Sequence, residues 1–223
     1  MGFAMKTTAA GGGGSVKAPA GNHMAVLVGV FEMGTQTDPF DATKARRQVC
    51  LAWELVNEEI AGTSKNHVVS AAVTQSLNEK ATLRKWVESR TGKKLANDGE
   101  FDLTSELGQA CMLNVVANEK GYTRVEGVAA LPNMKGMVVP KPGYKPVALT
   151  LEDYQGGAKI PDWVPWIYGN PLEDHINASH EIGKAKPNRK SNQQAQGGGQ
   201  AASKVPASEQ DAEYDPEALN ERF

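Results

Sequence analysis

The sequence is poor in cysteine and has no long apolar run. Only 2 of its 223 residues are cysteine. Cys50 and Cys111 each lie in a strand-like stretch, which indicates two reduced thiols in a core and not a disulfide framework. No stretch approaches the roughly 18 apolar residues that a membrane-crossing helix needs, and the first residues lack the apolar region of a secretory signal. These absences favour a cytoplasmic protein.

Catalytic and metal-binding motifs are missing as well. The sequence contains no GxSxG, no P-loop spacing and no HExxH. Its four histidines are not spaced as metal ligands, either with one another or with the cysteines. Asp38 and Asp41 lie in the stretch DPFDATKARR, where Asp and Pro are ordinary turn formers. We therefore expect no enzyme, no metal site and no cofactor.

The net charge of −2 is small but unevenly distributed. Residues 184–207 carry five basic and no acidic side chains, whereas residues 208–223 have a net charge of −5. Both stretches are poor in apolar residues, so we expect two disordered pieces of opposite sign. The first 20 residues, MGFAMKTTAAGGGGSVKAPA, show no apolar periodicity and predict a flexible arm.

Five stretches have the composition of β-strands, and their order predicts the fold. In residues 46–56, apolar side chains alternate with polar or small ones, the pattern of a half-buried strand. A short turn at residues 119–121 would join the last two strands in a hairpin. The predicted strands span residues 23–33, 46–56, 66–75, 109–118 and 122–131.

One helix is predicted between the third and fourth strands. The tetrapeptide Ser76-Leu77-Asn78-Glu79 matches a capping box. Leu83, Trp86 and Val87 then recur at helical spacing, and Thr91-Gly92 would end the helix. A short helical turn is expected in FDLTSELG, before the fourth strand. This order predicts a mainly β fold, a five-stranded OB-type barrel with one helix between strands three and four. A different small barrel or an α+β sandwich also fits the order.

An OB barrel binds oligonucleotides on the face of its second and third strands. Two loops border that face, one between strands one and two and one between strands four and five. Basic and aromatic residues of this chain gather at these positions. Cations there would follow the phosphates, and aromatic rings would accept unstacked bases. Each basic residue alone also fits an ordinary surface charge, and any positive potential must be local. The candidate DNA-binding residues are Phe40, Lys44, Arg46, Arg47, Lys65, His67, Lys120, Tyr122 and Arg124.

Five stretches of the chain form a recognisable set: APAGNHMAVLVGVFEMGTQ, RRQVCLAWEL, TQSLNEKATLRKWVESRTGKK, FDLTSELGQACMLNVV and YTRVEGVAALP. Together they resemble a family of phage single-stranded-DNA-binding proteins. The family has a "GTQ" after its first strand and an "SL…K…L+K" pattern at its helix. The resemblance covers about residues 18–132 and extends weakly to IPDWVPWI. It implies an OB-type fold and sequence-independent binding of single strands, with no catalytic residues to carry over.

The C-terminal region resembles the plan of bacterial and phage single-strand binders, in which a Gly/Gln-rich linker leads to an acidic tail that ends in an aromatic residue. Arg222 departs from that plan, because the bacterial tip is acidic or apolar there. The resemblance implies a tail that recruits replication or recombination proteins in the cytoplasm of an infected cell, and a homo-oligomer is possible. The candidate partner-binding residues are Asp211, Glu213, Asp215, Glu217 and Phe223.

The expected organisation has five parts, and other functions fit the same parts. A virion structural or assembly protein is one alternative, and a recombination mediator that anneals strands is another. Residues 133–182 hold clustered tryptophans that need burial on the barrel or a partner to bind. The parts are a flexible arm (1–20), an OB-fold DNA-binding domain (21–132), a Pro/Trp-rich strap (133–182), a basic Gly/Gln-rich linker (183–207) and an acidic interaction tail (208–223).

Overall fold

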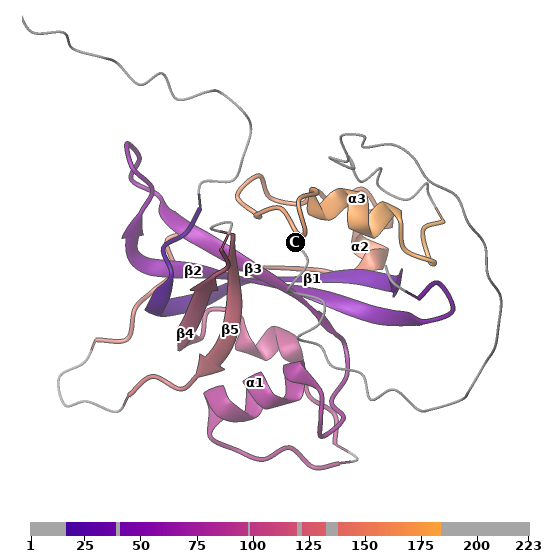
Figure 1. The fold of residues 1–223 in the computed structure, drawn as a ribbon, viewed down its shortest axis with the longest axis horizontal. Helices are drawn as coiled ribbons and strands as arrows, with labels where there is room; N and C mark the ends of the chain where they lie inside the picture. Colours follow the sequence, from indigo (N-terminus) through magenta and orange to yellow (C-terminus); the bar gives the residue numbers. More distant parts are fainter. Residues whose placement is uncertain (1–16, 39–40, 98, 120–121, 133–137, 184–223) are drawn as a thin grey trace, which may run out of the picture.

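The computed structural model describes residues 17–38, 41–97, 99–119, 122–132 and 138–183 (Figure 1). Phe40, Lys120, most of the expected arm, and the linker and tail from residue 184 onward lie outside this part, as do all five candidate partner-binding residues. The strands are β1 (Gly21–Thr37), β2 (Ala45–Glu59), β3 (Asn66–Thr74), β4 (Ala110–Ala117), β5 (Thr123–Ala129) and β6 (Val147–Leu149). The helices are α1 (Thr82–Thr91), the 3-10 helix η1 (Leu103–Glu106), α2 (Leu151–Gln155) and α3 (Leu172–Asn177).

The strands form one sheet in the order β3-β2-β1-β4-β5, and β6 pairs in parallel with the middle of β1. The other neighbouring strands are antiparallel. The mainly β fold, the five predicted strands and the helix between the third and fourth are therefore confirmed. β3 and β5 approach each other at the two ends of this order. Within the described residues they are not hydrogen-bonded, so the sheet is open and does not form the closed barrel that the sequence predicted.

Two apolar clusters lie on opposite faces of β1 and β2. The main cluster joins β1 to β5 with α1, and the Trp53 and Trp86 rings meet edge to face at 5.7 Å. The second joins Phe31 and Cys50 to the segment that contains β6, α2 and α3. Figure 1 shows α2 and α3 on one side of the long strands and α1 on the other. The prediction of a half-buried second strand is therefore wrong, because every residue of β2 from Val49 to Leu55 is buried.

The start of α1 differs from the prediction, but its end and its apolar face do not. The Ser76 hydroxyl accepts a hydrogen bond from the Asn78 N–H at 3.2 Å, which makes a turn ahead of the helix and not a capping box. The helix begins at Thr82, and its N-cap residue makes no side-chain bond. Gly92 ends the helix with a φ of 69°, as predicted. The apolar face and the short helical turn η1 are also confirmed.

Both cysteines are buried and free, as the sequence predicts. Burial raises the pKa of each thiol to about 12. No helix in the described part of the chain is long and apolar enough to cross a membrane. The same residues contain no group of three or more His, Cys, Asp or Glu side chains placed to hold a metal ion.

Candidate nucleic-acid interface

An exposed aromatic ring and a cation meet at the β4–β5 hairpin, and a second cation follows on β5. Tyr122 is 60% exposed, and the ammonium of Lys17 lies over its ring, 4.7 Å from the centroid. The hairpin is closed at this point because the Asn118 N–H donates to the Tyr122 carbonyl at 2.9 Å. Arg124, on β5, pairs with Glu126 at 3.1 Å. We call Lys17, Tyr122 and Arg124 the hairpin patch.

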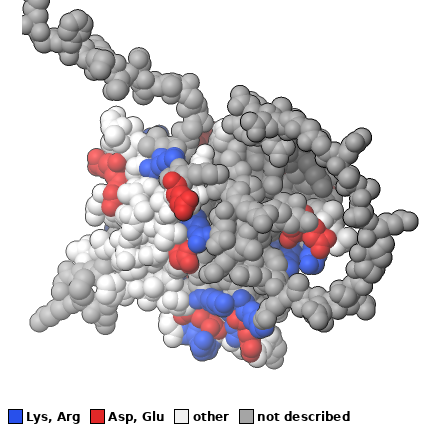
Figure 2. Space-filling model, viewed as in Figure 1, with Lys and Arg blue, Asp and Glu red and all other residues white. Residues whose placement is uncertain are grey.

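A second group of cations lies at the β1–β2 hairpin, and its members are paired with acids. Lys44 is 3.3 Å from Asp41, and Arg47 is 3.1 Å from Glu32. Both pairs are partly exposed, so water screens them and each contributes little to stability. The hydroxyl and N–H of Thr43 and the charge of Lys44 lower the pKa of Asp41. Figure 2 likewise shows acidic and basic groups interspersed on the face that it displays.

The two groups lie at opposite ends of β1. Arg47 is paired in register with Thr35, near the end of β1, whereas Val115 of β4 is paired with Gly21, at its start. At about 3.3 Å per residue the intervening strand measures roughly 45 Å along its path. The sequence grouped these cations into one site, but the structure places them in two.

Three candidates remain. Arg46 is half-buried on β2, in register with Gln36 of β1, and Lys65 and His67 differ in exposure. Lys65 is exposed in the turn before β3, where its N–H donates to the Thr63 hydroxyl at 3.2 Å. His67 is only 8% exposed. Its burial argues against a direct contact with DNA, so this member of the predicted set is left out of the site proposed below.

The face of β2 and β3 that we predicted to bind DNA is covered by the chain itself. Cys50 and Ala52 of β2 belong to the second apolar cluster, with Val68 of β3 packed beside them. The cover comes from residues 138–183, which we call the covering segment. Its Trp163 ring lies 6.2 Å from Phe31 of β1, edge to face. Apolar side chains of this protein therefore occupy the place where the prediction put bases.

A buried carboxylate holds the beginning of the covering segment on β2. Glu54 is 1% exposed. It accepts hydrogen bonds from the N–H groups of Gly143 at 2.7 Å and Tyr144 at 3.0 Å, and from the side-chain amide of Asn66 at 2.7 Å. The Tyr144 hydroxyl donates to the Asn66 carbonyl at 3.0 Å. The alternation pattern placed Glu54 on a solvent-facing side, so sequence reasoning missed this role.

The GTQ motif holds the other end of the covering segment. The Glu181 carboxylate accepts from the Thr35 N–H at 2.7 Å and from its hydroxyl at 2.8 Å. The Gln36 side chain donates to the His175 carbonyl at 3.0 Å. Gly34 has a φ of +71°, and an added Cβ would lie 2.7 Å from both Ser179 and Glu181. These contacts, which we call the latch, explain why glycine, threonine and glutamine follow one another here.

The surroundings of Glu181 favour its ionised form, which the latch requires. Burial raises the pKa of Glu181, but the two hydrogen bonds from Thr35 and the charge of Arg47 outweigh it, so the pKa is lowered overall. The same arginine was predicted to bind DNA, and here it contributes to holding the covering segment.

Sequence reasoning also missed Lys17, because the residues before it have the composition of a flexible arm. The structure shows Ala18 buried in the main cluster and the Pro19 carbonyl 3.1 Å from the His23 ring. A signal was present in the sequence, since Ala18-Pro19-Ala20 follows the glycine- and serine-rich residues 11–15.

No model of a protein family matches the chain, and no curated protein matches it significantly. The resemblance to phage single-strand binders therefore depends on the stretches quoted above, and it enters the next subsection only as support for a proposal.

Proposed function

We propose that this protein binds single-stranded DNA without regard to sequence, as a phage-type binding protein with an open OB-like sheet. The observation that carries the proposal is the hairpin patch. An aromatic ring that is 60% exposed, with the Lys17 ammonium over it and Arg124 two residues further along the chain, suits an unstacked base and its phosphate. The strand order, with α1 between β3 and β4, and the stretches that resemble phage single-strand binders support the same function.

In this proposal the DNA follows the β4–β5 hairpin and the start of β1, and not the β2–β3 face. The covering segment occupies that face through Trp163 and Tyr144, whose rings lie 5.4 Å apart. The cations near the β1–β2 hairpin are paired with acids, so they would add little long-range attraction for phosphates. Recruitment of replication proteins by the acidic tail remains part of the proposal.

Titration of the full chain with oligo-dT tests the proposal. We expect binding that weakens steeply as salt is raised, because cations that contact phosphates release counterions. A duplex of the same length is the matched control and should bind much more weakly. Equal affinity for the two, or no binding at low salt, would contradict the proposed function.

A further inference from the structure

Residues 166–170 form a closed turn that displays two aromatic rings. The Ile167 and Asn170 backbones exchange two hydrogen bonds, at 2.8 and 2.9 Å. Between them Tyr168 has a φ of 48° and Gly169 a φ of 80°, the geometry of a primed two-residue turn. Trp166 is 51% exposed and Tyr168 is 50% exposed. We call residues 166–170 the aromatic turn.

Two buried residues, Ile167 and His175, hold the aromatic turn in place. Ile167 is only 4% exposed and belongs to the second apolar cluster. The buried His175 ring lies 2.8 Å from the Ile167 carbonyl and meets the Tyr168 ring edge to face at 6.1 Å. The two exposed rings are therefore presented on a rigid support, which lowers the entropic cost of binding to them.

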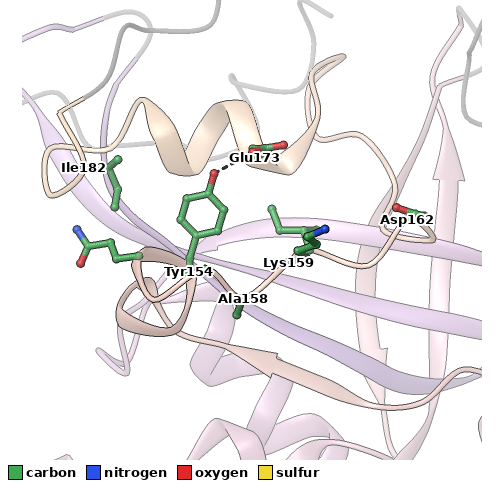
Figure 3. A pocket seen from close by; sticks show the side chains of 9 residues that line it. Tyr154, Ala158, Lys159, Asp162, Glu173 and Ile182 are labelled. Carbon is green, nitrogen blue, oxygen red and sulfur yellow. Dashed lines mark hydrogen bonds between the residues drawn. The ribbon is translucent and has the colours of Figure 1, made fainter.

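The segment that carries the aromatic turn is rich in acids. Residues 150–183 contain six carboxylates and one lysine. They also contain a hollow of about 690 Å³, whose lining includes two of these carboxylates (Asp162 and Glu173), the lysine (Lys159) and Ile182 (Figure 3). The Tyr154 hydroxyl donates to Glu173 across this hollow at 3.1 Å. Such a surface repels phosphate and attracts lysine and arginine, whose charges also bind aromatic faces.

We propose that the basic segment 184–207 of this chain docks on this acidic surface and on the aromatic turn. The segment carries five cations and no acid. It begins directly after Gly183, next to Ile182, which lines the hollow. Arg189 is six residues further on, a span of about 20 Å when extended. Because the segment is tethered at the surface that it complements, its effective concentration there is high.

Limited trypsin digestion of the full chain tests the docking. Cleavage after Arg189 and Lys190 is measured by mass spectrometry and normalised to cleavage after Lys6. A docked segment is cut only in the fraction of molecules where it is released. The double substitution Trp166→Ala and Tyr168→Ala should raise the normalised rate by about fivefold, the loss expected for two cation–aromatic contacts.

Tyr122→Ala is the matched control, because it removes an exposed ring outside the acidic surface, and it should leave the rate unchanged. Raising the salt to about 0.5 M should speed the normalised cleavage of the wild type and have less effect on the double variant, since salt screens the attraction. Identical normalised rates in the wild type and the double variant would overturn the proposal. So would unchanged cleavage together with a loss of oligo-dT affinity, which would make the aromatic turn a contact for DNA.

Discussion

Replacing Glu54 tests how the covering segment is held on the sheet. Its carboxylate is the acceptor for three donors, the N–H groups of Gly143 and Tyr144 and the amide of Asn66. Glu54→Ala leaves all three without this acceptor, and a buried donor without a partner costs about 1–3 kcal/mol. Because water can enter the space and satisfy some of them, we expect a total loss of about 3 kcal/mol.

The isosteric change Glu54→Gln separates hydrogen bonding from shape. One amide oxygen can keep both backbone donors, and Asn66 can reverse its own amide to accept from the new NH₂ group. We therefore expect a loss of about 1 kcal/mol for Gln. Thermal denaturation measures both effects, at about 2–4 °C per kcal/mol, or about 6–12 °C for Ala and 2–4 °C for Gln.

The matched control for these variants is Glu126→Ala, which removes a partly exposed carboxylate and should change stability by at most about 0.5 kcal/mol. A melting temperature of Glu54→Ala equal to that of the wild type would refute the reasoning. Equal losses for Ala and Gln would refute it too, because they would assign the effect to shape and not to the three hydrogen bonds.

Three further predictions concern the latch, the acid range and the thiols. Gly34→Ala forces a side chain into a φ of +71° and against the latch, so urea denaturation should show a loss of about 2 kcal/mol. The Leu95 N–H and neighbouring basic side chains lower the pKa of Glu88 from 4.5 to about 2. Its contribution is complete above pH 4.5 and is lost as the pH falls toward 2, so Glu88→Gln should flatten the acid limb of the stability profile. Cys50 and Cys111, whose pKa values are raised to about 12, should react with a thiol reagent only after unfolding.

Local patterns predicted the strands and the helix because each is determined by nearby residues. The alternating apolar residues of β2 all lie in the main cluster, and so do Leu83, Trp86 and Val87 of α1. Their spacing therefore predicted which side of each element is buried there. The capping box failed because Ser76 makes its hydrogen bond within a turn and the helix begins six residues later. A capping pattern identifies a polar turn near a helix without determining where the helix begins.

The candidate site was harder to predict because it depends on contacts between residues far apart in the sequence. The bond from Gly143 to Glu54, for example, joins the covering segment to β2 across 89 positions. No local pattern reports such a contact, so β2 was expected to have one exposed face. Tyr122 and Arg124 were identified from composition, but Lys17, which contacts the Tyr122 ring, is distant in sequence. The separation of the two cation groups follows from the length of β1.

Oligo-dT affinity of the Tyr122→Ala variant tests the central claim most directly. The comparison uses the full chain at one low salt concentration, with Val138→Ala as the control, because that side chain is 85% exposed and lies outside the hairpin patch and the aromatic turn. Because one stacked base contributes about 1–3 kcal/mol, we predict that Tyr122→Ala weakens binding by about fivefold or more. The control variant should bind like the wild type. Unchanged affinity of Tyr122→Ala, in a wild-type protein that does bind oligo-dT, would contradict the assignment of the hairpin patch as the binding site.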